Sequence, residues 1–324
     1  MAQRKFRELS GVWAGLPVPW NESMGIDEEA AAADVRACCR AGVHGVYTGG
    51  TTGEFYAQDD DTFRRLVELV VTSATPTATP VQAGCTALST RWVRRRIEIA
   101  AQAGVDGIQV ALPFWLRLSD EEVVAFFRDV ARAAGNLPLV LYDTDRAKRR
   151  VGVELFRRIR EVAPTLMGCK FTGGDVEALR PLVEALPEVS FFVGEHILPD
   201  AMRIGARGSC SSLVYLNPAF MLEYYRLCAA GEWDRVAPMQ SDIVRLFTEG
   251  IRPLKDRGLM DSAIDRVFGR VLGFLRCGLR CQPPYVHATE TDLDALRNWM
   301  KSNAPMLLED PQSFRGRTLS SSSR

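Results

Sequence analysis

Histidine is scarce in this chain, which has only His44, His196 and His287 in 324 residues. No two of them share the short spacing that places two imidazoles on one helix face, and no Cys-x-x-Cys occurs. Histidine and cysteine are the usual protein ligands of zinc and other transition metals. Carboxylates alone could hold Mg²⁺, but no acidic cluster stands at the predicted strand ends. We therefore expect no metal.

An excess of charge of either sign is also absent. Forty Lys and Arg balance forty Asp and Glu, so nothing predicts a nucleic-acid or membrane partner. No apolar run approaches the roughly 20 residues of a membrane helix, and the start lacks a signal-peptide core. The eight cysteines are scattered and do not resemble a disulfide framework. We expect reduced thiols in a cytoplasmic protein.

What the chain does contain is a regular alternation of short apolar segments and helical patterns. Each apolar segment is bounded by Gly, Pro or Asp, which is typical of buried parallel strands covered by helices. Eight strand–helix units favour a closed (β/α)₈ TIM barrel of the α/β class over an open sheet, and no Gly-x-Gly-x-x-Gly opens a helix. The expected strands are 11–18, 43–48, 81–85, 107–112, 137–142, 166–171, 190–194 and 208–213.

The strand pattern stops near residue 230. We expect a barrel catalytic domain over 1–230, a C-terminal helical appendage over 231–305 and a disordered tail over 306–324, which is polar and rich in serine. The additional helices are expected at about 232–248, 261–277 and 290–302.

Lys170 stands near the carboxyl end of the sixth predicted strand, followed by a glycine turn and a helical pattern. In parallel α/β folds the carboxyl ends of the strands carry the chemistry. An amine held in apolar surroundings loses its charge more easily and can attack a carbonyl to form a Schiff base. The alternative is a lysine that only extends from a strand end to solvent.

Two further features fall at the same rim of the predicted barrel. Gly49–Glu54 joins a strand to a helix, and its backbone and hydroxyls can hold a carboxylate or oxyanion, although it lacks a P-loop ending. Tyr142 ends the fifth strand, so its phenol should lie beside Lys170 as a proton shuttle. Each feature alone could be structural, as a threonine-capped turn and a strand-end tyrosine.

Three motifs resemble those of the dihydrodipicolinate synthase/N-acetylneuraminate lyase family of Schiff-base aldolase-type lyases, which are (β/α)₈ barrels with extra C-terminal helices. Gly50–Glu54 matches the family loop that binds the carboxylate of pyruvate. Tyr142 matches the family tyrosine, and Gly168-Cys-Lys170 with Gly174-Asp175 matches the signature around the Schiff-base lysine. The 28-residue interval from Tyr142 to Lys170 is the usual one, and the resemblance runs from about residue 11 to about 300.

The resemblance implies roles for these residues. Lys170 would bind pyruvate as an imine, Tyr142 would be the central acid and base, and Thr51 would extend a hydroxyl relay from Tyr142. No cofactor is implied beyond this covalent imine, and a homo-oligomer, a tetramer or dimer, is implied. The implied substrate-binding residues are Gly50, Thr52 and Cys210, the last through its backbone carbonyl.

Two departures bear on the substrate. Ala147 occupies the position, five residues after Tyr142, where the synthase has its substrate-binding arginine, and Trp115 replaces the tyrosine that completes the synthase relay. These differences argue against a true dihydrodipicolinate synthase. Pro-x-Trp ending at Trp115, together with 84–90 and 280–285, resembles the hydratase-aldolases, which cleave aryl-substituted unsaturated oxo acids to pyruvate and an aldehyde. Trp115 could instead pack at the rim.

We therefore expect a Schiff-base lyase that makes or uses pyruvate by reversible aldol-type cleavage of a 2-oxo acid, with an aromatic aldehyde partner. A lowered pKa would make the Lys170 amine competent near neutral pH. The alternatives are a 2-oxo-3-deoxy sugar-acid dehydratase or aldolase, and a non-catalytic binding protein on the same scaffold. The basic run Arg146–Arg150 could bind an acidic aldehyde or form a solvated loop face.

Overall fold

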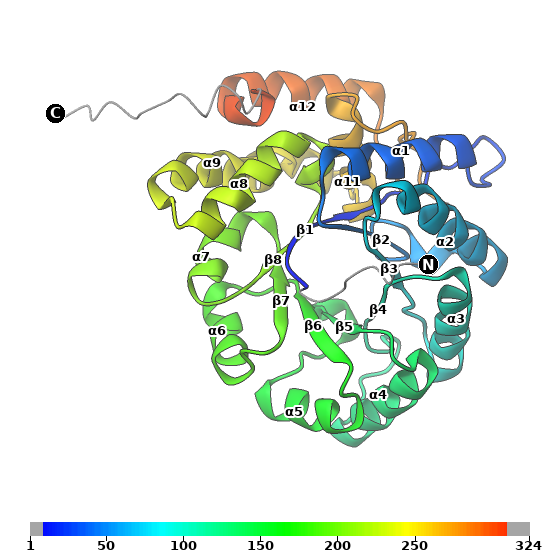
Figure 1. Cartoon of the computed structure of the whole chain (residues 1–324). Helices are drawn as coiled ribbons and strands as arrows, with labels where there is room; N and C mark the ends of the chain where they lie inside the picture. The colour runs from blue at the N-terminus through cyan, green and yellow to red at the C-terminus, as the bar shows by residue number, and fades with distance from the viewer. Residues whose placement is uncertain (1–8, 310–324) are drawn as a thin grey trace.

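The computed structural model describes residues 9–309 and contains a closed barrel of eight parallel strands. Each strand pairs with the next, and the last closes on the first, so the predicted (β/α)₈ fold is confirmed (Figure 1). The strands are β1 (Gly11–Gly15), β2 (Gly45–Thr48), β3 (Val81–Gly84), β4 (Gly107–Val110), β5 (Leu139–Asp143), β6 (Leu166–Phe171), β7 (Ser190–Val193) and β8 (Gly208–Ser211).

A helix follows each strand and packs on the outside of the barrel (Figure 1). Side-chain caps set several starts: Asp27, Asp59 and Asp175 each accept a hydrogen bond from a backbone N–H in the first turn. Such a cap stabilises a helix by about 1 kcal/mol. The helices are α1 (Glu28–Ala41), α2 (Asp60–Ala74), α3 (Thr90–Ala103), α4 (Asp120–Ala134), α5 (Val153–Val162), α6 (Val176–Ala185), α7 (Leu198–Arg203) and α8 (Pro218–Ala230).

Two apolar clusters hold the barrel together. The larger lies between the strands and the surrounding helices, as expected for strands that are buried on both faces. The smaller cluster contains Leu9, Trp13, Tyr47, Val140 and Phe192, with Cys210 at its edge. Because its members on the strands point inward, side chains fill this part of the barrel. Functional groups must therefore lie toward the strand ends.

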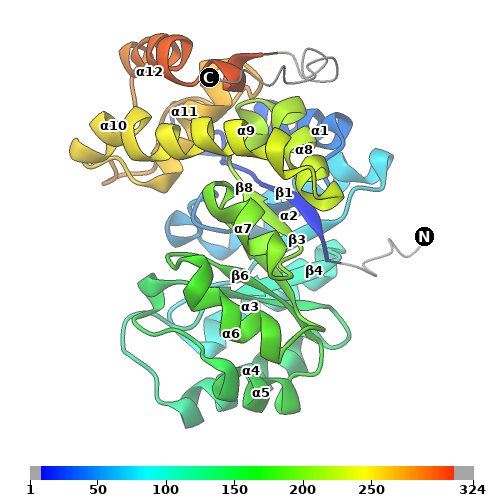
Figure 2. The ribbon, with the colours of Figure 1, turned by 90° about the vertical axis from the view of Figure 1, so that its left-hand side faces the viewer.

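The C-terminal helices are α9 (Trp233–Arg245), α10 (Arg252–Asp256), α11 (Asp261–Val271) and α12 (Glu290–Asn303). They form a layer along one side of the barrel near α1 and α8 (Figure 2). The helix predicted over 261–277 is shorter in the structure because the chain turns at Gly273, which has a positive φ of 75°. The segment after this turn contacts the loop that follows β2, since the backbone N–H of Gln282 donates to Glu54.

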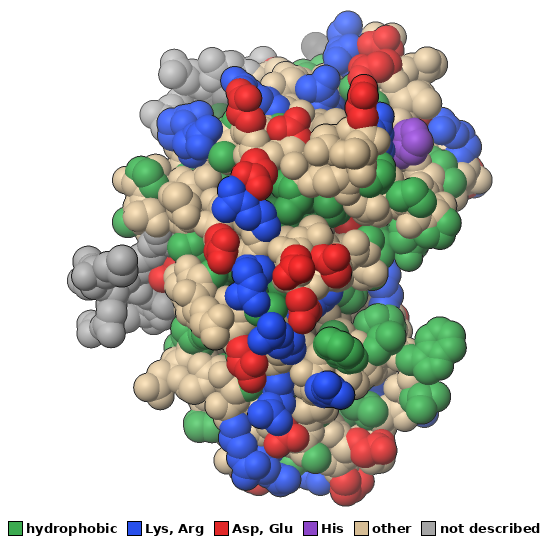
Figure 3. All heavy atoms as spheres, turned by 90° about the vertical axis from the view of Figure 1, so that its right-hand side faces the viewer, with side chains coloured by type: hydrophobic (Ala, Val, Ile, Leu, Met, Phe, Trp, Pro, Cys, Tyr) green, Lys and Arg blue, Asp and Glu red, His purple; other side chains and the backbone are tan. Residues whose placement is uncertain are grey.

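The domain boundaries proposed at 230 and 305 stay predictions. Where the tail is expected to begin, Pro305–Leu308 form a 3₁₀ turn, and Leu307 is buried. The remainder of that tail, 310–324, lies outside the described residues. Over residues 9–309, no helix has the length and apolar character needed to cross a membrane. On the face over α2 and α3, acidic and basic side chains are interspersed, and hydrophobic side chains gather along one edge (Figure 3).

A buried ion pair joins the loop after β2 to α11. The Arg266 guanidinium donates to the Glu54 carboxylate, and neither side chain is exposed to solvent. The same carboxylate accepts the indole N–H of Trp20 at 2.5 Å and the backbone N–H of Gln282 at 2.9 Å. Glu54, the last residue of the Gly-Thr-Thr-Gly-Glu motif, thus fastens the loop to the C-terminal helices.

Replacing Glu54 with glutamine should lower the free energy of unfolding by about 3–5 kcal/mol, because it leaves the buried Arg266 charge without its partner. Urea denaturation of the purified variant measures this loss. Glu28→Gln is the matched control, since Glu28 pairs with Arg65 at the exposed surface and should move the midpoint far less. Equal, small shifts in both variants would show that the buried pair does not hold the loop.

Candidate active site

Lys170 and Tyr142 face each other at the carboxyl ends of β6 and β5. The two residues are register partners in these strands, and the Lys170 ammonium nitrogen lies 4.4 Å from the centre of the Tyr142 ring. The same nitrogen donates a hydrogen bond to the hydroxyl oxygen of Tyr47 at 3.2 Å. The amine thus contacts the ring of Tyr142, as its strand-end position predicts, and the hydroxyl of Tyr47 on β2.

The pKa of Lys170 differs from the expected direction. Burial lowers it, but the surrounding phenols of Tyr47 and Tyr142 and the thiol of Cys210 raise it, and the balance lies well above the ordinary lysine value. The expectation of a lowered pKa assumed apolar walls, whereas polar groups surround this amine. This direction favours the ammonium form of Lys170, which must give up a proton before it attacks a carbonyl.

Thr51 lies within reach of the Tyr142 hydroxyl, because its Oγ1 is 3.4 Å from that oxygen. Glycine shapes the loop that carries Thr51. Gly49 has a φ of 71°, and a Cβ there would lie 2.4 Å from the carbonyl oxygen of Gly84 on β3. Only glycine permits this close approach, which sets the position of the two threonines that follow.

The predicted substrate-binding residues lie close to this group. Thr52 and Cys210 line the same cavity of about 410 Å³ as Lys170, and Tyr142 and Thr51 form part of its wall. Gly50 lies next to Tyr47, since a Cβ on Gly50 would be 3.3 Å from the Tyr47 ring. The predicted residues from β2, β5, β6 and β8 thus converge at one end of the barrel. Their roles stay predictions.

Sequence reasoning missed several groups in this cavity. Tyr47, Glu195 and Asp265 line it, and Asp265 accepts a hydrogen bond of 2.5 Å from the Thr52 hydroxyl. Tyr47 precedes the last residue of β2, so its position near a strand end could have identified it. Asp265 lies on α11 and is 213 residues from Thr52, and no local pattern relates them.

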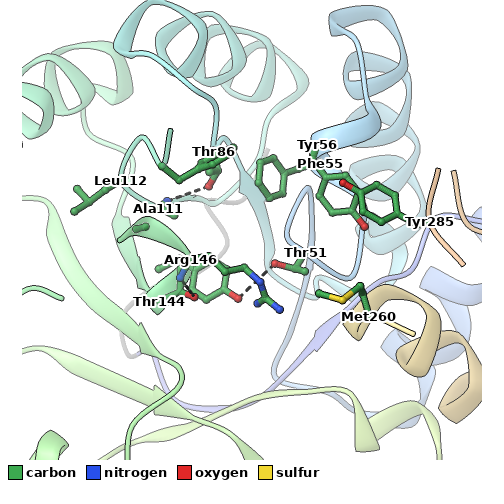
Figure 4. A pocket seen from close by; sticks show the side chains of 13 residues that line it. Thr51, Phe55, Tyr56, Thr86, Ala111, Leu112, Thr144, Arg146, Met260 and Tyr285 are labelled. Carbon is green, nitrogen blue, oxygen red and sulfur yellow. Dashed lines mark hydrogen bonds between the residues drawn. The ribbon is translucent and has the colours of Figure 1, made fainter. Parts of the chain in front are cut away.

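An apolar pocket of about 210 Å³ adjoins the lysine cavity, and Thr51 and Tyr142 line both. Figure 4 shows aromatic rings on one side of the pocket and the guanidinium of Arg146 near Thr51. The rings meet edge to face, with centroids 6.1 Å apart for one pair and 4.8 Å apart for the other. The aromatic residues of these two pairs are Phe55 with Phe114 and Tyr56 with Tyr285.

Trp115 does not line this pocket. Its side chain is 72% exposed, while the preceding Phe114 faces inward among the lining residues. The amine of Lys148 donates to the backbone carbonyl of Trp115 at 2.6 Å and lies 5.5 Å from its ring centre. Phe114 therefore lines the pocket that Tyr142 also lines, whereas Trp115 lines a neighbouring surface pocket together with Phe114.

The basic run Arg146–Arg150 mainly anchors its own loop. Arg149 binds the carbonyl of Leu118 and the carboxylate of Asp120, and Arg150 binds Asp143. Arg146 is different, because it lines the apolar pocket and forms a 2.9 Å ion pair with Asp261 of α11. Ala147 lines the same pocket but carries no charge. The positive charge there comes from Arg146, the residue before it.

The chain matches the Dihydrodipicolinate synthetase family over residues 8–301. It is 30% identical to an uncharacterized DapA-like lyase of Halobacterium salinarum, over 72% of this chain and 77% of that protein. It is 26% identical to the trans-O-hydroxybenzylidenepyruvate hydratase-aldolase of Pseudomonas aeruginosa, over 86% and 87% of the two chains.

The fold is shared with solved structures. YagE of E. coli K12, a protein of the dihydrodipicolinic acid synthase family in complex with pyruvate, superposes with a TM-score of 0.83 at 18% identity, over 91% of this chain and 98% of that one. N-acetylneuraminate lyase of Fusobacterium nucleatum superposes with a TM-score of 0.80 at 20% identity, over 91% and 99%. The family match and the 30% identical relative go beyond this likeness of fold. The chain belongs to the dihydrodipicolinate synthetase family, whose members are pyruvate-dependent lyases and synthases, and it is an enzyme of this kind.

Proposed function

We propose that this enzyme is a Schiff-base lyase that makes or uses pyruvate by reversible aldol-type cleavage of a 2-oxo acid, with an aromatic aldehyde as the second product or substrate. The observation that carries the proposal is the position of Tyr142 and Thr51 between two cavities. One cavity contains Lys170 and polar groups, and the other is lined by aromatic rings. A 2-oxo acid bound to Lys170 would extend its aryl end into the aromatic pocket.

The chemistry begins at Lys170. After losing a proton, its amine attacks the 2-oxo carbon, and the carbinolamine expels water to give a protonated imine. The substrate carries a hydroxyl on C4. As that hydroxyl gives up its proton, the C3–C4 bond breaks and its electron pair moves to the protonated imine, which leaves an enamine on Lys170 and a free aldehyde. Protonation of the enamine carbon and hydrolysis then release pyruvate.

Tyr142 is placed to move the protons in these steps. Its ring lies against the Lys170 amine, 4.4 Å from the amine nitrogen to the ring centre, and its hydroxyl lies 3.4 Å from that of Thr51. A hydroxyl pair at this position can take a proton from one cavity and return it in the other. No cofactor is needed for this route, and a homo-oligomeric assembly stays a prediction.

The lining of the second pocket supports an aromatic aldehyde. A flat ring placed among Phe55, Tyr56 and Phe114 gains about 0.5–1.5 kcal/mol beyond simple burial from aromatic contacts. Ala147 leaves room where the synthase has an arginine. Arg146 keeps its charge, since Asp261 and Tyr142 outweigh the effect of burial and raise its pKa. An aryl group with an acidic substituent would therefore also find a partner here.

Supplied with pyruvate, the enzyme should prefer benzaldehyde-type partners over sugar-type aldehydes and aspartate semialdehyde by tenfold or more in kcat/KM. Phe114→Ala should lower kcat/KM for the aryl aldehyde about tenfold, because the ring loses an edge contact and buried apolar area. Steady-state kinetics with each aldehyde measure both effects. Trp115→Ala is the matched control, since its exposed ring should contribute little.

Two outcomes would contradict the aromatic assignment. A tenfold preference for a sugar-type aldehyde would support the dehydratase or aldolase of 2-oxo-3-deoxy sugar acids. A larger loss from Trp115→Ala than from Phe114→Ala would place the aldehyde at the outer rim.

A further inference from the structure

The C-terminal helix α11 contributes a buried carboxyl group to the lysine cavity. Asp265 lines this cavity, and only 8% of its surface is exposed. Its Oδ2 lies 2.5 Å from the Oγ1 of Thr52, in the loop that follows β2. Thr52 is the residue expected to hold the carboxylate of the 2-oxo acid. The Asp265 carboxyl group is therefore already in contact with the Thr52 hydroxyl, which is expected to bind the carboxylate of the substrate.

The direction of this hydrogen bond decides what Thr52 can do. A hydroxyl has one proton to donate. If Asp265 is ionised, it can only accept, so the Thr52 proton points to Asp265 and away from the substrate. If Asp265 is protonated, it can donate to Thr52 Oγ1, and the Thr52 proton is free to point into the cavity. The neutral form also removes a negative charge from the surroundings of an anionic substrate.

The groups around Asp265 move its titration into the neutral pH range. Burial and then the charge of Asp261 raise the pKa of Asp265 to about 7, against the hydrogen bond from Thr52, which lowers it. Glu195 raises this pKa further, and Lys170 lowers it. The titratable groups that face Asp265 from the neighbouring elements are Asp261, Glu195, Lys170, Tyr215 and Cys277.

We propose that Asp265 is a positioning residue that, in its neutral form, turns the Thr52 hydroxyl toward the carboxylate of the bound 2-oxo acid. The proposal rests on the proposed function, because it requires a 2-oxo acid beside Lys170. Substrate binding then depends on pH with a definite sign. Affinity for pyruvate is full while Asp265 is protonated, and it is lost as the pH rises through the pKa of Asp265.

Formation of the imine does not add its own pH dependence to the affinity for pyruvate. An ammonium and a carbonyl give a protonated imine and one water, with no net release of a proton. While Lys170 stays an ammonium in the free enzyme and a protonated imine in the complex, this equilibrium has no pH dependence. A loss of pyruvate affinity above about pH 7 therefore reports on another group.

The test measures the apparent dissociation constant of pyruvate from pH 5.5 to 9, by the pyruvate concentration needed for half-maximal borohydride labelling of Lys170. For the native chain it should rise above the pKa of Asp265, by at most about tenfold per pH unit, until it reaches the weaker affinity of the ionised form. Asp265→Asn should give a flat profile with tight binding retained at high pH, because the amide N–H still donates to Thr52. Asp261→Asn is the matched control and should keep the step, moved to lower pH.

Thr52→Val provides a second variant that does not alter the carboxyl group. It should weaken pyruvate binding below pH 7 and reduce the step, because the hydroxyl that transmits the effect is gone. Asp265→Asn could instead show the same rise of the apparent dissociation constant with pH as the native chain. That result would overturn the inference and leave the proposed function intact. A complete absence of labelling at every pH would overturn the proposed function, and the inference with it.

Discussion

Treatment with pyruvate and sodium borohydride should add about 72 Da, the mass of a reduced pyruvyl group, to the peptide that contains Lys170. The expectation follows from the position of the amine at the end of β6, within a cavity that has room for a small 2-oxo acid. Peptide mass spectrometry after proteolysis identifies the labelled residue. Lys170→Met should remove the label and lower kcat roughly 10³-fold or more, because the amine that is proposed to form the imine is gone.

Lys255 is the matched control for this labelling, since it lines the same cavity. Its replacement by methionine should leave the label on Lys170 in place. Label on Lys255 or on any other lysine would show that the imine forms elsewhere. Lack of label with a substrate that the enzyme demonstrably turns over would exclude a Schiff-base route altogether.

Tyr142→Phe should lower kcat roughly 10²–10⁴-fold, the usual range for the loss of general acid–base catalysis. The variant keeps the ring against the Lys170 amine and removes only the hydroxyl that faces Thr51. Binding of pyruvate and the thermal midpoint should therefore change little. Steady-state kinetics and a melting curve on the same preparation separate the two effects.

Tyr47→Phe is the natural comparison, because Tyr47 also contacts the Lys170 amine but is not among the residues that line the apolar pocket. Its loss should affect turnover less than the loss of the Tyr142 hydroxyl. If Tyr142→Phe changed kcat by less than about threefold, Tyr142 would be a packing residue. If Tyr47→Phe were the more damaging variant, Tyr47 would be the proton carrier and the relay through Thr51 would be wrong.

The fold could be predicted from the sequence because its signals are local. Apolar strands, amphipathic helices and the caps at Asp27, Asp59 and Asp175 are each read within a few residues. Eight repetitions of one unit then leave little choice of architecture. The strand-end positions of Lys170 and Tyr142 followed from the same alternation, since adjacent parallel strands place such residues side by side.

Contacts between distant segments could not be predicted in this way. The pairs Glu54–Arg266 and Thr52–Asp265 join residues more than 200 positions apart, and no periodicity connects a barrel loop to a C-terminal helix. The inward ring of Phe114 and the outward ring of Trp115 are neighbours in sequence. Which of them faces the pocket depends on how their loop packs against the chain around Lys148.

The pKa of Lys170 shows most clearly which properties the sequence predicts and which depend on tertiary structure. A lysine at an apolar strand end is evident from sequence, and burial does lower its pKa as expected. The phenols and thiol that reverse this shift come from β2, β5 and β8, and only barrel closure brings them together. Sequence therefore determined the barrel and the residues at its rim, whereas tertiary structure decided their electrostatics, because a pKa depends on every polar group within a few ångströms, whatever its place in the chain.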